Sequence, residues 1–176
     1  MERAAVLPRV LGGDPSAGDA AARSFLRTGS LEEARVFCRR MYYGPLDVRP
    51  AAGLAGFAFS ADVARIGPLT VGEVSYGAEM CVGIGELGTA YHVLAPLTGV
   101  VHARHRGGST TADPARAVLL QPHGAVDLRW SADCRLISVK VERLAFEREL
   151  GPPPEAPLGL TFGVADGAGR SWLGLV

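Results

Sequence analysis

The amino-acid sequence predicts a mainly β fold: a double-sheet jelly-roll barrel with flanking α-helices, one early and one or two C-terminal. Between residues 54 and 141, apolar residues recur at nearly every second position in short segments, the spacing of half-buried strands. Gly, Pro and Asp residues separate these segments, as they do at turns. A length of 176 residues suits one domain with a single core. Many short strands joined by tight turns are typical of such barrels.

The sequence of the N-terminal part predicts an arm that is followed by a helix. Residues 1–24 are expected to form a mobile arm, because their Gly, Pro, Ala and Asp side chains bury little apolar surface. Ser30-Leu-Glu-Glu33 is a capping box, in which the Ser30 hydroxyl accepts from the Glu33 N–H and the Glu33 carboxylate accepts from the Ser30 N–H. A helix should therefore begin at Leu31 and stop at Gly44-Pro45. Its expected apolar side consists of Leu31, Ala34, Val36, Phe37, Cys38 and Met41.

Residues 25–142 are assigned to the barrel and this leading helix. The predicted strands cover residues 56–66, 69–76, 80–84, 90–97, 100–105, 117–120, 125–130 and 136–141. One intervening segment, Gly83-Ile-Gly-Glu-Leu-Gly88, matches the G-x-G-x-x-G pattern of dinucleotide-binding loops. A β-rich run follows it where that motif needs a helix, so we interpret these glycines as a turn between strands.

Residues 143–176 are predicted to form a C-terminal helical segment. Arg143 to Leu150 is helix-prone and ends at Gly151-Pro-Pro-Pro154. Residues 158–162 can form a short extended piece, and residues 166–176 begin like an amphipathic helix that is cut short. The apolar residues of this segment are expected to form a homodimer interface. They are Leu144, Phe146, Leu150, Trp172, Leu173 and Leu175.

Charge and cysteine content exclude several classes of protein. The 18 basic and 18 acidic residues cancel, so the chain lacks the basic surface of a free-standing nucleic-acid binder. Five arginines, at positions 104, 106, 116, 129 and 135, are expected on a solvated surface. The three cysteines form no C-x-x-C pair, which indicates reduced thiols. Without a signal peptide or an apolar run of about 18 residues, the chain is predicted to be cytoplasmic, with no membrane contact.

Four sequence segments occur in an order that suggests a family. They are Thr28-Gly-Ser-Leu-Glu-Glu-Ala-Arg35, Tyr91-His-Val-Leu-Ala-Pro-Leu-Thr-Gly99, Arg116-Ala-Val-Leu-Leu-Gln-Pro122 and Leu128-Arg-Trp-Ser-Ala-Asp-Cys134. Together they resemble the N-terminal cupin-like sensor domain, of the AraC-binding-like branch, of bacterial AraC/XylS-type transcription regulators. The resemblance covers about residues 24–176.

This resemblance implies a cupin-like double-stranded β-helix that binds a small-molecule effector or a partner. It also implies a homodimer, formed through helices after the barrel, that sets the spacing of two DNA-binding domains. Contact with DNA would then be made only by a C-terminal helix-turn-helix domain, which is absent from this chain. The candidate ligand-binding wall of the barrel is Tyr76, Met80, Tyr91, His92, Leu94, Val126, Leu128 and Trp130.

The four histidines do not reproduce the metal site of cupin enzymes. In those enzymes an H-x-H pair, a Glu and a later His hold a divalent ion. If Gly99 ends the first cupin motif, the Glu position falls on His92 and the paired histidines fall within residues 85–88, where no imidazole exists. If Pro122-His-Gly124 belongs to the second motif, the last His position falls on Asp127, opposite the apolar face of its strand.

We therefore predict no metal, no cofactor and no catalytic residue. His102 and His105, three positions apart on one strand, should face opposite sides, and no G-x-S-x-G or activated-Cys signature is present. Elemental analysis should find less than about one tenth of an equivalent of any transition metal. The alternatives are a metal-dependent cupin enzyme acting on a small acid or sugar, and a ligand-free structural dimerisation module whose aromatic residues simply fill the barrel.

Overall fold

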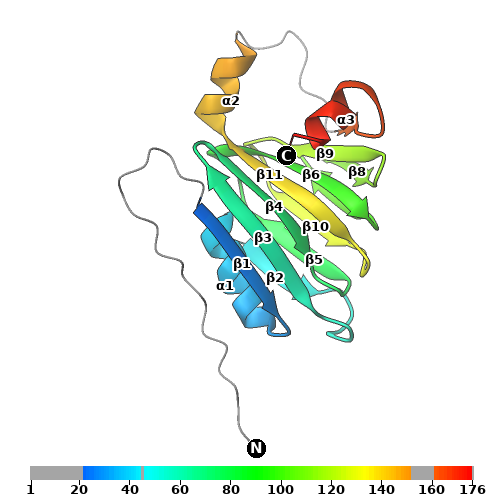
Figure 1. The fold of residues 1–176 in the computed structure, drawn as a ribbon. Helices are drawn as coiled ribbons and strands as arrows, with labels where there is room; N and C mark the ends of the chain where they lie inside the picture. Colours follow the sequence, from blue (N-terminus) through cyan, green and yellow to red (C-terminus); the bar gives the residue numbers. More distant parts are fainter. Residues whose placement is uncertain (1–21, 45, 152–160, 176) are drawn as a thin grey trace, which may run out of the picture.

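The computed structural model describes residues 22–44, 46–151 and 161–175 (Figure 1). In these residues two antiparallel sheets enclose one core, as predicted, and the fold is mainly β. The strands are β1 (Ala22–Thr28), β2 (Leu46–Pro50), β3 (Phe59–Ile66), β4 (Leu69–Ser75), β5 (Met80–Ile84), β6 (Ala90–Thr98), β7 (Val101–His105), β8 (Gly108–Ala112), β9 (Arg116–Leu120), β10 (Val126–Trp130), β11 (Arg135–Glu142) and β12 (Thr161–Gly163). The helices are α1 (Leu31–Met41), α2 (Arg143–Leu150) and α3 (Gly167–Leu173).

The two sheets divide the strands in the order of a jelly roll. The larger described sheet has the order β1-β3-β4-β11-β6-β9-β12, and the smaller one has the order β2-β5-β10-β7-β8. Strand β10 illustrates how the sequence sets the inner face. Val126, Leu128 and Trp130 are buried between the sheets, whereas Asp127 and Arg129 are exposed on the outside. The predicted period of two is therefore confirmed for this strand.

All eight predicted strands are present, but β1, β2 and β8 were not predicted. Strand β1 includes residues 22–24, which the sequence assigned to the arm; the rest of the arm lies outside the described residues. An edge strand pairs on one side and tolerates charged residues, so its sequence shows little alternation. Here the guanidinium of Arg23 donates from two nitrogens to the Asp62 carboxylate on β3, at 2.7 and 2.5 Å.

The hairpin between β7 and β8 corrects the predicted turn at Gly107-Gly108. Arg106 and Gly107 both have positive φ, 51° and 76°, as a two-residue type I′ turn requires. Gly108 already belongs to β8 and pairs with His105. The guanidinium of Arg106 donates to the side-chain oxygen of Gln121, which helps to hold this non-glycine residue in the left-handed region.

Helix α1 begins at Leu31, as the capping box predicts, and packs beside β1 and β2 (Figure 1). The Glu33 N–H donates to the Ser30 hydroxyl at 3.3 Å. The reciprocal contact differs from the prediction, because Thr28 lies between the two groups. Its hydroxyl accepts from the Ser30 N–H at 2.9 Å and donates to the Glu33 carboxylate at 2.5 Å.

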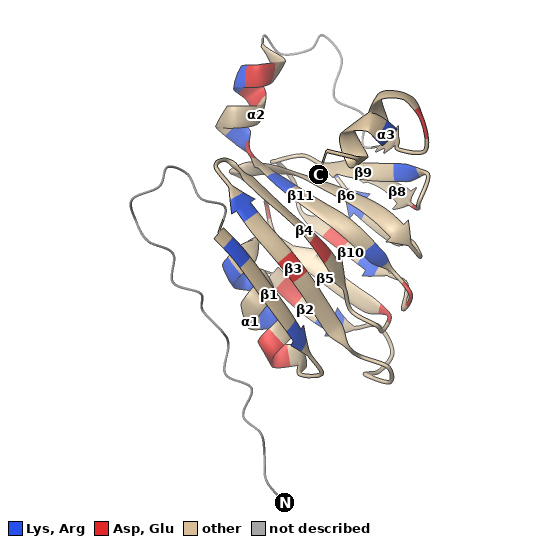
Figure 2. Cartoon of the chain, in the orientation of Figure 1, with Lys and Arg blue, Asp and Glu red and all other residues tan. Residues whose placement is uncertain are grey.

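The charges of α1 follow the helix dipole, with Glu32 and Glu33 in the first turn and Arg39 and Arg40 in the last (Figure 2). Val36 was expected on the apolar side of this helix but is 56% exposed. Val36, Phe37 and Cys38 are successive residues. Successive residues of a helix point in different directions, so a narrow apolar stripe cannot include all three.

Gly99 lies in the turn between β6 and β7 with a φ of 66°. A Cβ atom at this position would lie 2.5 Å from the Ser131 hydroxyl and 2.7 Å from the Cys134 Cα. We expect Gly99→Ala to lower the free energy of unfolding by about 2 kcal/mol or more, because it adds left-handed strain and a backbone clash. Urea unfolding would measure this loss. Gly85→Ala is the matched control, since its Cβ would meet no atom within 4 Å; equal losses in the two variants would contradict the expectation.

Candidate functional site

A cavity of about 40 Å³ lies between the two sheets. Its wall comes from α1 and the segment after it, from both sheets, and from strands far apart in the sequence. The lining residues are Cys38, Tyr42, Leu46, Val74, Tyr76, Val82, Ile84, His92, Leu94, Leu128, Trp130 and Ser138. Its volume is enough for one to a few water molecules.

Some buried polar atoms at this cavity lack a hydrogen-bond partner among the described residues. They are Nδ1 of His92 and Nε1 of Trp130, and the Tyr43 hydroxyl lies unpaired nearby. Each side chain is less than 10% exposed. A buried polar group without a partner costs about 1–3 kcal/mol, so water or a small ligand in the cavity would be stabilised by these groups.

His92 is the central polar residue of the site. Its Nε2 lies 2.7 Å from the Ser138 hydroxyl, and its ring stacks on Tyr42 with centroids 5.5 Å apart. Burial, together with the smaller effect of the Lys140 charge, lowers the His92 pKa to about 3. The imidazole is therefore neutral at neutral pH, and it offers a hydrogen bond rather than a positive charge.

The Lys140 ammonium contacts Tyr42 and Tyr43, although Lys140 itself does not line the cavity. It donates to the Tyr42 carbonyl at 2.7 Å and lies 4.6 Å from the centre of the Tyr43 ring, within the range of a cation–π contact. Burial lowers its pKa, and the positive charge of Arg65 adds to that effect.

Cys38, Tyr76 and Trp130 also line the cavity. The Cys38 Sγ lies 3.7 Å from the Tyr76 hydroxyl, and the Tyr76 ring meets Trp130 edge-on at 5.0 Å. Burial raises the pKa of the Cys38 thiol to about 11 and also raises that of Tyr76. The Cys38 thiol is thus protonated at neutral pH and is a poor nucleophile.

The structure brings together most of the predicted wall. Tyr76, His92, Leu94, Leu128 and Trp130 line the cavity. Met80 and Val126 are buried in the same core without lining it.

Tyr91 lies on the opposite face of its sheet, and its placement in the barrel wall was wrong. Its ring packs against Phe146 at 4.5 Å, and its hydroxyl donates to Glu147 at 3.3 Å. Adjacent residues of a strand point to opposite faces. Tyr91 and His92 therefore cannot both face the interior.

Sequence reasoning did not identify Cys38, Tyr42 or Ser138 as part of the site. Tyr42 and Tyr43 follow α1 directly, so two adjacent aromatic residues at a helix end were the available signal. Ser138 stands between Leu136 and Lys140 on the inward side of β11. A small polar residue at an inward position of a strand points to a polar interior.

The other histidines lie apart from the cavity. His105 is buried, with its Nδ1 3.2 Å from the Ala125 carbonyl and its Nε2 accepting from the Gln121 N–H at 3.1 Å. His102 is exposed on the other side of β7, so the predicted opposite orientation is confirmed. Within the described ranges, no three His, Cys, Asp or Glu side chains are grouped so that they could hold a metal ion.

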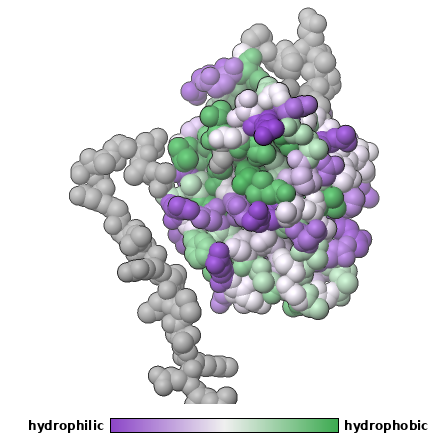
Figure 3. Space-filling model, turned by 45° about the vertical axis from the view of Figure 1, so that its right-hand side comes forward, coloured by the Kyte–Doolittle hydropathy of each residue, from purple (hydrophilic) through white to green (hydrophobic). Residues whose placement is uncertain are grey.

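The predicted dimer residues are partly exposed and partly packed. Leu144, Leu150 and Leu175 are 75%, 44% and 86% exposed. Phe146 packs on Tyr91, while Trp172 and Leu173 pack on the outer face of the larger sheet. Figure 3 shows hydrophobic residues gathered on the upper part of the molecule. Those on the outer face of this sheet include Val71, Ile137 and Val141, which are partly buried.

Comparison with known proteins identifies the family and a relative of this chain. The family model of the AraC-binding-like domain matches residues 34–176. A protein of Rhodococcus erythropolis named "Probable thc operon regulatory protein" is 28% identical over 172 residues, which is 93% of this chain and 51% of that protein. The chain thus spans about half the length of the curated relative that it matches.

The solved structure of an AraC-like protein shows the same fold. The AraC-like transcriptional activator CuxR superposes with a TM-score of 0.59 at 13% identity, covering 73% of this chain and 51% of CuxR. KdgF from a Halomonas species matches with a TM-score of 0.42 at 15% identity, over 55% of this chain and 86% of KdgF. Among the described residues, no helix is long and apolar enough to cross a membrane. The predicted resemblance is confirmed, and the chain belongs to the family of AraC-binding-like domains.

Proposed function

We propose that this chain is the effector-sensing and dimerisation domain of an AraC-type transcription regulator that acts in the cytoplasm. It would control DNA binding by a C-terminal helix-turn-helix domain that is not part of this chain. The family match supports this proposal, as does the name of the Rhodococcus relative, which describes an operon regulatory protein. The neutral net charge supports it too, because this chain alone lacks the charge to bind DNA.

The observation that carries the sensing role is the set of unpaired polar atoms at the interior cavity. Nδ1 of His92 and Nε1 of Trp130 offer hydrogen bonds that no described residue uses. Neither the His92 imidazole nor the Tyr42 phenol is charged at neutral pH, and Lys140 does not line the cavity. A charged ligand would therefore have no counter-ion among the lining side chains, at a large cost. The effector should therefore be a small, uncharged molecule with hydrogen-bonding groups.

Ligand binding would be coupled to α1. Tyr42 caps the C-terminal end of this helix and also lines the cavity. A ligand too large for this small cavity has to displace lining side chains, and displacement of Tyr42 would move the end of α1 with it. Such a ligand shifts the equilibrium between two positions of α1 only as far as its affinities for the two conformations differ.

Matched pairs of small probes test this proposal by thermal unfolding. Acetamide and benzyl alcohol should raise Tm by about 1 °C or more at concentrations above their Kd, whereas acetate and benzoate should not. Trp130→Phe removes the unpaired N–H and should reduce the rise. Trp172→Phe, which changes a tryptophan outside the barrel, is the control and should keep it.

The small volume of the cavity favours a second candidate, the ligand-free structural dimerisation module. In that case the aromatic residues fill the barrel, and a few waters satisfy the unpaired atoms. Equal Tm changes for neutral and charged probes, or no change at all, would favour this module over the sensor.

The dimerisation role is supported by α2, which buries no residue in the described part of the chain. Sedimentation at about 100 μM should show a dimer. Leu144→Glu places a charge on the exposed helix face and should raise the dimer Kd by about tenfold or more. Val36→Glu is the control, because Val36 is also an exposed apolar helix residue but lies on α1. Monomeric behaviour of the wild-type chain would contradict this role.

A further inference from the structure

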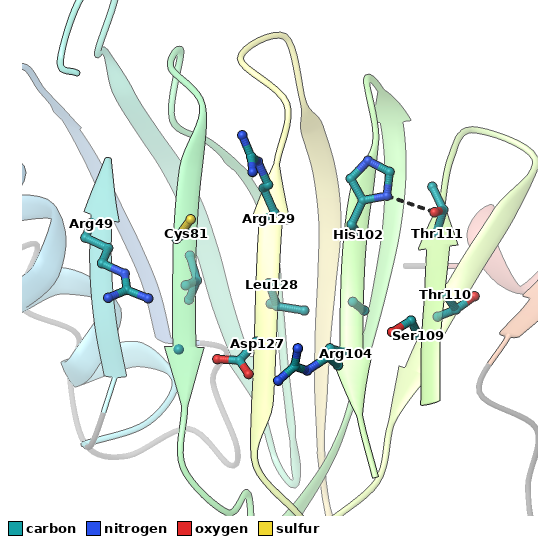
Figure 4. Close-up of a pocket in the computed structure, with 13 residues that line it drawn as sticks. Arg49, Cys81, His102, Arg104, Ser109, Thr110, Thr111, Asp127, Leu128 and Arg129 are labelled. Carbon is teal, nitrogen blue, oxygen red and sulfur yellow. Dashed lines mark hydrogen bonds between the residues drawn. The ribbon is translucent and has the colours of Figure 1, made fainter. Parts of the chain in front are cut away.

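A hollow of about 520 Å³ lies on the outer face of the smaller sheet, on the other side of β5 and β10 from the interior cavity (Figure 4). We propose that it binds a small hydroxylated anion, a molecule that carries a carboxylate or phosphate group on a hydroxyl-bearing skeleton. This site goes beyond the proposed interior site. Its volume falls within the range of small-molecule sites, which is about 300–1,000 Å³.

The shape of the hollow follows from the residues of its central strands. The outer face of β5 carries Cys81 and Gly83, which are short. The register places Arg49 on β2 and Arg129 on β10 on either side of Cys81. Neighbouring strands lie about 4.8 Å apart, so the two arginine backbones are separated by roughly 10 Å. Two long side chains at that spacing can reach one ligand held over the short residues between them.

The arginines have donor groups to spare. Nε of Arg129 donates to Glu79 at 2.6 Å, and Nε of Arg49 lies 3.8 Å from the Asp47 carboxylate. Both ion pairs are largely exposed, so they add little stability, and they leave the terminal nitrogens of both guanidinium groups available. The side chain of Arg104 makes no hydrogen bond or ion pair with the described residues. Planar guanidinium groups of this kind bind carboxylates and phosphates through paired hydrogen bonds.

The other side chains of the hollow favour a ligand with hydroxyl groups. Asp127 lies beside Arg104 in the sheet register, and the Arg104 side chain extends toward the strand of Asp127 in Figure 4. The Asp127 carboxylate repels a bare anion but accepts hydrogen bonds from hydroxyls. Ser109 and Thr111 supply hydroxyls on the β8 side, where Thr111 lies 2.9 Å from Nδ1 of His102. The described lining holds no Phe, Tyr or Trp, so a polyol fits better than an aromatic base, which would need a stacking surface.

Calorimetric titration with citrate and with glucose 6-phosphate tests the proposal. At least one of them should bind with a Kd of about 1 mM or less, and inorganic phosphate or sorbitol should bind at least about tenfold more weakly. Arg104→Gln should weaken binding by about tenfold or more, the effect of losing a charge-assisted hydrogen bond. Arg116→Gln, an exposed strand arginine of the other sheet, should change the Kd by less than about twofold.

Three further results decide the interpretation. Binding of citrate alone or of glucose 6-phosphate alone supports the site and identifies its acid group. Asp127→Asn should strengthen phosphate binding and reduce the preference for the hydroxylated probe. Trp130→Phe should leave phosphate binding and this preference unchanged, which separates this site from the interior cavity.

The proposal is overturned if neither probe binds, if phosphate binds as well as they do, or if Arg104→Gln and Arg116→Gln cause equal losses. Arg129→Gln replaces Arg104→Gln if that variant does not fold.

Discussion

Trp130→Ala is expected to lower the free energy of unfolding by about 3–5 kcal/mol, the range for deleting a large buried aromatic side chain. Trp130 is 5% exposed and lies between Met80 and Val101 in the sheet register. Its ring also packs edge-on against Tyr76. Removing it would enlarge the interior cavity, and neighbours on both sheets would lose contacts.

The loss should fall toward the lower end of this range, because the substitution also removes a buried N–H that has no described partner. Urea unfolding followed by far-UV circular dichroism measures the difference. Trp172→Ala should cost less, since Trp172 is only half-buried outside the barrel. A loss below about 1 kcal/mol for Trp130→Ala would show that the ring is exposed and that the assigned face of β10 is wrong.

The strands were predictable where the sequence alternates, and β10 shows why. Val126, Leu128 and Trp130 alternate with charged residues, and one buried face suffices to set this pattern. Strand β8, with the sequence Gly-Ser-Thr-Thr-Ala, has no such pattern. It exists because a type I′ turn folds it back onto β7, so its register comes from the turn and not from its own apolar residues.

The candidate sites were less predictable, because each gathers residues that only the sheet register brings together. Tyr42 and Ser138 reach one cavity from a helix end and from β11. The outer hollow collects Arg49, Arg104 and Arg129 from three strands. The sequence analysis expected Arg104 and Arg129 on a solvated surface, and both are exposed. Only the short residues of β5 between neighbouring strands make the hollow in which they can act together.

Acidification is expected to destabilise the protein through His92. The pKa of His92 is lowered to about 3 in the folded state, compared with about 6.5 in an unfolded chain. Between these values the unfolded state binds a proton that the folded state does not, so stability is complete above pH 6.5 and falls as the pH decreases toward 3. The slope approaches about 1.4 kcal/mol per pH unit, which amounts to a loss of about 2 kcal/mol at pH 5.

His92→Gln isolates this effect, because glutamine can still bond to Ser138 but does not titrate. Between about pH 7 and pH 5, the wild-type protein should lose about 2 kcal/mol more stability than this variant. His123→Gln, which changes an exposed histidine, should behave like the wild type. Lys140→Met removes a charge that lowers the His92 pKa and should therefore reduce the loss. If wild type and His92→Gln lose stability equally, His92 accepts its proton in the folded state, which requires an interior wet enough to solvate an imidazolium ion.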